Sequence, residues 1–185
     1  MKINLAQSHK INILLLILLS YLFFVFGNGV ISLTSPDEVF YAQTAKEMAQ
    51  HRSWITPYLF DAPNFEKPIF LYWLLRFSFI LFGISNFAAR FFPALFAILG
   101  VIALYGLGML GFADRKKAFL SALVLMSSGF YLALAKTVFT DMVFSVWILL
   151  AILAFFWGYV KTEHKGLRII LFFLGTPNLA RSHFQ

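Results

Sequence analysis

Four long stretches of this sequence contain no charged residue, and they limit what the chain can fold into. They cover residues 11–33, 91–112, 118–135 and 142–160. A helix needs about 20 apolar residues to cross the hydrocarbon core of a bilayer. Each stretch therefore predicts a transmembrane helix, and we extend the second prediction back to residue 87. With 61% hydrophobic and 12% charged residues, the composition is that of an integral membrane protein.

The first stretch could be mistaken for a secretory signal. Its apolar region is longer than the roughly 7–15 residues of a signal core, and no A-x-A-like cleavage site follows it. We therefore expect it to remain in the protein as a membrane anchor.

The segment 69–82 between Pro68 and Gly83 is apolar but short for a span, and Arg76 lies at its middle. We predict an interfacial or re-entrant helix, with Tyr72 and Trp73 at headgroup level and Arg76 reaching toward water.

The distribution of basic residues supports this choice. If 69–82 does not span, the N-terminus, the turn at 113–117 and the loop at 161–168 share one side, with eight basic residues and two acidic ones. The positive-inside rule makes that side cytoplasmic. Residues 34–90 and the turn at 136–141 then lie together on the outer face, where Asp37 and Asp141 can meet.

The end of the sequence departs from this pattern. An apolar segment begins at 167 but stops at 175, and residues 176–185 form a polar tail. Nine residues cannot span a membrane. The segment is either an interfacial stub or the start of a helix in a longer protein, and we favour the second interpretation. Without internal repeats or flexible linkers, residues 1–185 are treated as a single membrane unit.

Several kinds of chemistry are disfavoured. The absence of cysteine excludes disulfides and thiolate chemistry, and the four histidines are too scattered for a metal triad or a Ser-His-Asp set. The sequence has no P-loop and no G-x-G-x-x-G motif, which argues against a nucleotide-driven pump. The net charge of +7 comes from basic residues in short loops, so we expect no nucleic-acid partner and instead contacts with membrane lipids.

The start of the outer loop carries candidate acidic residues. Ser35, Pro36 and Glu38 fit a capping box at the start of a short helix along the membrane surface. Asp37 is not needed for that box and remains free to face a substrate.

Other polar side chains of the outer face have both a structural and a functional explanation. Lys67 could anchor to phospholipids or bind a lipid-linked phosphate. Asp141 could cap the fourth span and Lys136 could reach to the interface, or both could serve a site. Arg90 is interpreted as an interfacial anchor of the second span.

The order of motifs resembles a known family, the lipid-carrier-dependent membrane glycosyltransferases of the aminoarabinose transferase and protein O-mannosyltransferase superfamily, especially the bacterial aminoarabinose-transferase-like branch. The resemblance covers about residues 10–175. It rests on the pairs Asp37-Glu38 and Tyr41-Ala42, "WITP" at 54–57, "FEKP" at 65–68 followed by "LYW", "AARFFPALF" at 88–96 and "TDM" at 140–142.

The resemblance implies the N-terminal part of a C-type glycosyltransferase fold: an all-α membrane protein with four transmembrane helices, a truncated fifth, and juxtamembrane helices in the first outer loop, residues 34–86. It also implies a polyprenyl-phosphate-sugar donor and a lipid A-like or protein acceptor outside the cytoplasm of a bacterial inner membrane. The implied catalytic residues are Asp37 and Asp141. The implied substrate-binding residues are Lys67, Glu38, Tyr41 and Lys136, and Glu66 matches a position that can help to hold a divalent metal ion.

Two positions depart from the family pattern, because Phe40 and Lys136 stand where arginine is frequent. The functional alternative is a non-catalytic membrane fragment or partner subunit whose carboxylates only cap helices. A lipid flippase or other transporter is a weaker third hypothesis, because spans two to four carry no buried charge that would mark a pathway.

Overall fold

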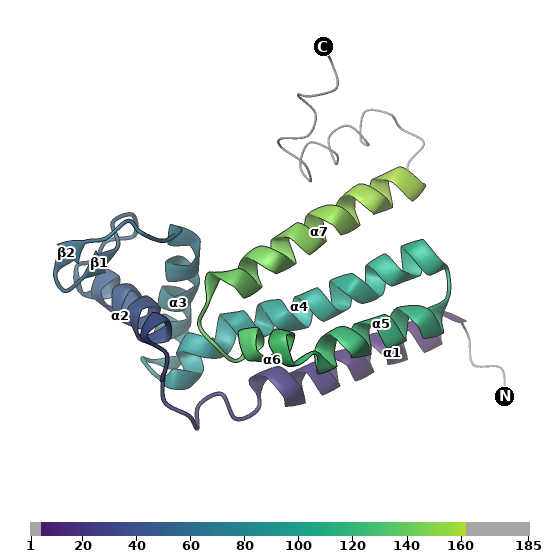
Figure 1. The fold of residues 1–185 in the computed structure, drawn as a ribbon, viewed down its shortest axis with the longest axis horizontal. Coiled ribbons are helices and arrows are strands. Elements are labelled where there is room, and N and C mark those ends of the chain that lie inside the picture. The colour runs from purple at the N-terminus through teal and green to yellow at the C-terminus, as the bar shows by residue number, and fades with distance from the viewer. Residues whose placement is uncertain (1–4, 162–185) are drawn as a thin grey trace, which may run out of the picture.

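The computed structural model describes residues 5–161, in which helices are joined by loops and one short hairpin (Figure 1). This confirms the helical membrane fold class; the predicted segment 167–175 and tail 176–185 lie outside the described residues. The elements in chain order are α1 (Leu5–Ser20), a π-helical turn η1 (Tyr21–Val25), α2 (Pro36–Gln50), β1 (Tyr58–Leu59), β2 (Ala62–Pro63), α3 (Ile69–Phe82), α4 (Asn86–Phe112), α5 (Arg115–Ser127), α6 (Gly129–Ala135) and α7 (Thr140–Lys161).

Two long helices match the predicted spans closely. α4 and α7 are long and apolar enough to cross a membrane, and the bent pair α5 and α6 can supply a third crossing. α4 begins one residue before the predicted start at 87, and α7 begins two residues before the predicted start at 142. The described helices account for two or three spans, so the count of four stays a prediction.

The first span is shorter than the predicted 11–33. Its helix ends at Val25, and Gly27 follows with a φ of +81°, a conformation that glycine adopts without steric cost. The chain then runs through a turn and an extended stretch to α2. Hydropathy could not show this end, because the residues after it are also uncharged.

The third span, predicted as continuous over 118–135, is broken. Ser128 has extended backbone angles (φ −64°, ψ 122°) and separates α5 from α6, whose axes differ by 67°. Its backbone N–H still donates to the carbonyl of Leu125, which closes the end of α5.

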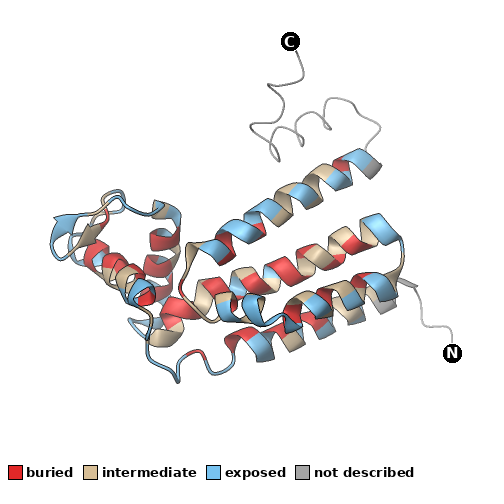
Figure 2. Ribbon diagram, viewed as in Figure 1, coloured by how far each residue is buried: buried red, intermediate tan, exposed pale blue. Residues whose placement is uncertain are grey.

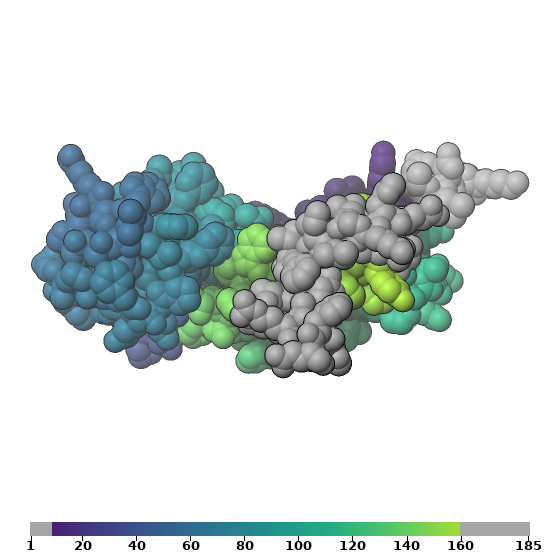
Figure 3. Space-filling model, turned by 90° about the horizontal axis from the view of Figure 1, so that it is seen from above, coloured from purple at the N-terminus to yellow at the C-terminus, as the bar shows by residue number. Residues whose placement is uncertain are grey.

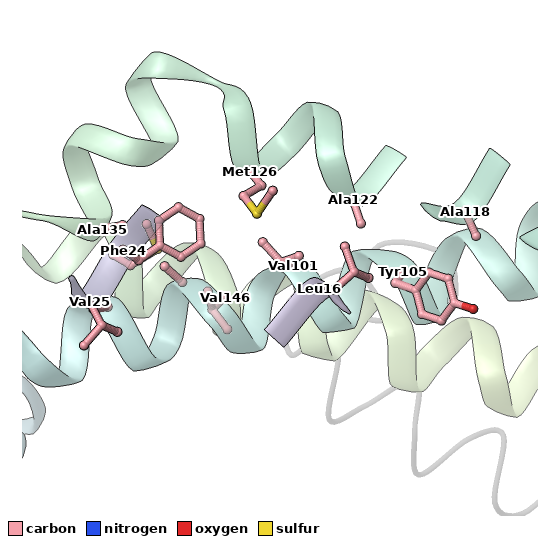
Figure 4. Close-up of a cluster of buried hydrophobic side chains, with 13 residues drawn as sticks. Leu16, Phe24, Val25, Val101, Tyr105, Ala118, Ala122, Met126, Ala135 and Val146 are labelled. Atoms are coloured by element: carbon pink, nitrogen blue, oxygen red, sulfur yellow. The ribbon is translucent and has the colours of Figure 1, made fainter. Parts of the chain in front are cut away.

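The bundle is held by apolar side chains and by close approach of helices. Figure 4 shows buried side chains of the first span and of α4, α5, α6 and α7 meeting in one cluster, among them Leu16, Val101, Met126 and Val146. A Cβ added to Gly108 would lie 2.9 Å from the Cα of Ala118, so α4 and α5 cross almost backbone to backbone. Small residues at helix crossings favour association where lipid removes the usual hydrophobic driving force.

The outer loop forms a second packed unit at one end of the bundle. α2, α3 and the β1–β2 hairpin gather there, and from above they form a distinct block (Figures 1 and 3). The buried residues Tyr41, Met48, Tyr72 and Leu75 join α2 to α3, and Val143 of α7 reaches the same cluster. Burial is concentrated here and along α4, whereas α7 is largely exposed (Figure 2).

Candidate functional site

A buried ion pair lies where the outer unit meets the bundle. Arg90, in the first turns of α4, donates from Nε and Nη2 to the two carboxylate oxygens of Glu38, both at 3.0 Å. Both side chains are almost fully buried, with exposed fractions of 6% and 1%. Buried charges of opposite sign require this kind of two-point pairing, because either one alone would be strongly unfavourable.

The same two side chains hold two further backbone segments. Arg90 also donates to the carbonyls of Asn28 at 3.3 Å, Ile31 at 2.6 Å and Ser32 at 3.1 Å. Glu38 accepts from the backbone N–H of Val138 at 3.1 Å, in the turn before α7. The pair therefore fastens the end of the first span, the start of α2, α4 and the 136–139 turn at one point.

This network corrects two sequence-based interpretations. Glu38 does not form a capping box, since the Ser35 side chain makes no cap hydrogen bond. The Glu38 side chain is buried, so in this structure it offers no exposed surface to a substrate. Arg90 is a buried partner and not an interfacial anchor. A capping box is a local pattern, and no spacing rule links residue 38 to residue 90.

Asp37 lies beside this network but takes no part in it. Its side chain is exposed in the first turn of α2, and no partner for it is found among residues 5–161. Asp37 is thus a free carboxylate on a rigidly held turn.

Asp141 lies on a neighbouring segment. It is exposed in the first turn of α7, three residues after Val138, which is bonded to Glu38. The structure therefore joins the backbone segments that carry Asp37 and Asp141.

Two predicted substrate-binding residues make contacts within the protein, and their role toward substrate stays a prediction. Lys136 donates to the carbonyl of Phe26 at 3.0 Å and so fixes the end of the first span. Tyr41 is only 3% exposed, and its ring lies 5.9 Å from that of Tyr72. Burial raises the pKa of Tyr72 to about 12, with Tyr41 and Glu66 adding to the increase.

Lys67 and Glu66 are both exposed in the segment that leads into α3. Pro68, the next residue, begins the lining of an apolar cavity of about 380 Å³ between α3 and α7. Thr140, next to Asp141, lines the same cavity. Lys67 and Asp141 therefore each adjoin a residue of its wall. The lining residues are Pro68, Phe70, Leu71, Thr140, Val143, Phe144 and Trp147.

The loop between α2 and α3 is fastened by Arg76. Its guanidinium carbon lies 3.7 Å from the centre of the Trp54 ring, and its Nη1 donates to the carbonyl of Ser53. Trp73 Nε1 donates to the carbonyl of Trp54 at 2.6 Å. Arg76 does not reach to water as predicted, because it is only 8% exposed and is held by the loop.

The hairpin is fastened to α2 through Glu47. This carboxylate accepts from Gln43 Nε2 at 2.7 Å and from the backbone N–H of Asp61 at 3.1 Å. His51 adds a 3.0 Å contact to Asp61 and stacks on Tyr58. Burial alone raises the pKa of Glu47, but these hydrogen bonds and nearby His51 outweigh it, and the pKa lies below its ordinary value of 4.5.

This lowered pKa predicts acid sensitivity of the outer unit. A carboxyl whose pKa is lowered by folding stabilises the protein above its unfolded pKa, and the contribution is lost as pH falls through the folded value. We expect the unfolding temperature, followed by tryptophan fluorescence, to fall below pH 4.5, and Glu47→Gln to reduce that dependence. Identical pH profiles for the two proteins would contradict this role.

The described residues do not form a metal site. No group of three or more His, Cys, Asp or Glu side chains gathers within residues 5–161. Glu66 has its backbone N–H bonded to Asn64 Oδ1 at 3.0 Å, but the described part of the chain gives its carboxylate no partner ligands. The metal role of Glu66 therefore stays a prediction.

The arrangement is that of a solved membrane protein. The crystal structure of ArnT from Cupriavidus metallidurans in the apo state matches with a TM-score of 0.80 at 21% sequence identity, over 91% of this chain and 31% of that one. The crystal structure of the same protein bound to undecaprenyl phosphate matches with a TM-score of 0.77 at 20% sequence identity, over 93% of this chain and 31% of that one. This chain therefore has the fold of about a third of that protein.

The sequence comparisons define the family. The sequence model of the dolichyl-phosphate-mannose-protein mannosyltransferase family matches residues 10–177, and the chain belongs to this family. Undecaprenyl phosphate-alpha-4-amino-4-deoxy-L-arabinose arabinosyl transferases of Photorhabdus laumondii and Proteus mirabilis are 37% identical over 140 residues and 30% over 159. These matches cover 76% and 86% of this chain but only 25% and 29% of the relatives. The family resemblance that we inferred from the sequence motifs is confirmed.

Proposed function

We propose that this chain is the N-terminal membrane portion of a glycosyltransferase that moves a sugar from a polyprenyl-phosphate donor to a lipid A-like or protein acceptor. The reaction would take place on the outer face of a bacterial inner membrane, with the N-terminus in the cytoplasm. Family membership and the bacterial relatives support the class of reaction. The excess of basic residues on the opposite side supports the orientation.

The observation that carries the proposal is the contrast between Asp37 and Glu38. The Glu38 carboxylate accepts hydrogen bonds from Arg90 and from the backbone N–H of Val138. The neighbouring Asp37 is exposed and without a partner among the described residues. A carboxylate held in this way is suited to act as a general base.

The proposed step is a displacement at the sugar carbon attached to phosphate. The acceptor oxygen attacks that carbon while Asp37 takes its proton, and the bond from the carbon to the phosphate oxygen breaks with its electron pair leaving on the phosphate. Lys67 neutralises the charge that develops there, and Asp141 orients the reacting groups. The apolar cavity between α3 and α7 suits the first part of a polyprenyl chain, because its wall adjoins Lys67.

Replacing Lys67 by Gln tests the phosphate contact. Since a hydrogen bond to a charged group contributes about 1.5–3 kcal/mol, we expect the KM for a polyprenyl-phosphate donor to rise by roughly 10- to 100-fold. Transfer would be measured in native membranes by mass spectrometry of lipid A and of membrane proteins. Lys46→Gln, on α2 of the same outer unit, is the matched control. An unchanged KM in the Lys67 variant would remove this residue from the site.

A non-catalytic membrane protein is the competing function. It is favoured by the finding that Glu38, Tyr41 and Lys136 make structural contacts instead of lining a substrate site. Under this alternative, no substitution at Asp37 or Lys67 would change sugar transfer in the membrane.

A further inference from the structure

A second cavity lies at the end of the bundle far from the candidate site. It has a volume of about 730 Å³ and lies between the first turns of α1 and the last turns of α4 and α7. Its wall is almost entirely apolar. The main lining residues are His9, Gly106, Met109, Leu150, Leu153 and Trp157.

One polar side chain and one amphipathic side chain lie at this cavity. His9 Nδ1 is 2.9 Å from the hydroxyl of the buried Tyr105, so the ring is fixed in orientation. Trp157 is 48% exposed. Tryptophan and histidine rings of this kind favour the level of lipid headgroups, where one side is apolar and the other is wet.

The surroundings of the cavity are basic. Lys10 is exposed on α1 beside His9, and α1 contacts α5, whose first residues include the exposed Lys116 and Lys117. The N-terminal ends of α1 and α5 lie at the same end of the bundle (Figure 1). Asp114 is the single carboxylate in the described residues of this end, and it accepts from the backbone N–H of Lys116 at 2.8 Å.

We propose that this cavity binds an anionic phospholipid of the adjacent leaflet, with an acyl chain inside it and the headgroup phosphate beside His9 and Lys10. An apolar cavity at a bundle end that carries exposed lysines on α1 and α5 complements a molecule that has an apolar chain and a negative head. A zwitterionic lipid offers the same chain but no net charge for the lysines. The site lies in the leaflet opposite the proposed catalytic residues and is independent of sugar transfer.

Native mass spectrometry of the purified protein in detergent, titrated with phosphatidylglycerol or phosphatidylcholine, tests this site. We expect one phosphatidylglycerol to be retained in preference to phosphatidylcholine. Because each basic residue near a membrane surface adds attraction to anionic lipid, Lys10→Gln should weaken retention roughly fivefold. Lys46→Gln, at the other end of the protein, should leave retention unchanged.

A cavity-filling variant separates the chain-binding site from simple surface charge. A Cβ at Gly106 would lie 3.6 Å from the Leu153 side chain, so Gly106→Leu should fit the helix and occupy the cavity. We expect it to abolish selective retention while the protein keeps its unfolding temperature. Equal retention of the two lipids, or retention of phosphatidylglycerol that survives both Lys10→Gln and Gly106→Leu, would overturn the proposal.

Discussion

Replacing Asp37 by Asn is expected to lower the rate of sugar transfer by roughly 10²- to 10⁴-fold, the range usually lost when a general base is removed. The change keeps the size of the side chain and removes its ability to accept a proton. Because Asp37 has no partner among the described residues, the unfolding temperature should not change. Transfer would be measured in native membranes at saturating donor, so that a loss appears in kcat.

Asp61→Asn is the matched control for this experiment. Asp61 is also an exposed carboxylate of the outer loop, but it lies in the hairpin and contacts His51. Equal losses in the two variants would point to a general effect of charge on the outer surface. Full activity of Asp37→Asn would leave the non-catalytic alternative standing.

The second large effect is expected on stability, from Arg90→Met. This change leaves the Glu38 carboxylate buried without its counter-ion, and removing one partner of a buried ion pair costs about 3–5 kcal/mol. It also leaves the carbonyls of Asn28, Ile31 and Ser32 without their donor. We expect a much lower unfolding temperature in detergent and rapid proteolysis of the outer loop.

A second substitution distinguishes the charge effect from the loss of packing. Glu38→Gln removes the buried charge but retains an oxygen that can accept from the N–H of Val138. The double variant Glu38→Gln, Arg90→Met should therefore be more stable than Arg90→Met alone. If the two substitutions instead destabilise additively, the ion pair is not the unit that holds these segments.

The helices of the bundle could be predicted because hydropathy measures the property that places them. The charge-free run from 142 gave the start of α7 to within two residues, and extension of the run at 91 back to 87 gave the start of α4 to within one. The same signal could not locate the end of the first span or the break at Ser128. Both depend on backbone conformation inside uncharged sequence, at Gly27 and at Ser128.

Sequence could predict those candidate site residues whose side chains make no contact with distant segments. Asp37 was expected to face a substrate and Lys67 to contact a phosphate of a phospholipid or a lipid-linked sugar, and the structure leaves both side chains exposed. Glu38, Tyr41 and Lys136 could not be assigned from sequence, because their contacts come from distant segments. The partner of Glu38 lies 52 positions away, and its bond to Val138 spans 100 positions. The arginine in "AARFFPALF" was the available signal, but its burial depends on how the loop folds over it.

The hydrogen bond between Glu38 and Val138 also determines the order in which parts of this junction can form as the protein is synthesised. Residues 28–38 leave the ribosome long before residue 138, and Arg90 must enter the membrane with α4 in between. The outer loop therefore cannot complete its anchoring until the turn before α7 has been synthesised and has reached it. In the nascent protein Glu38 and Arg90 can pair first, and arrival of Val138 completes the junction. A chain arrested during synthesis before that turn would leave its 34–85 segment open to added protease, and release of the next helix would protect it.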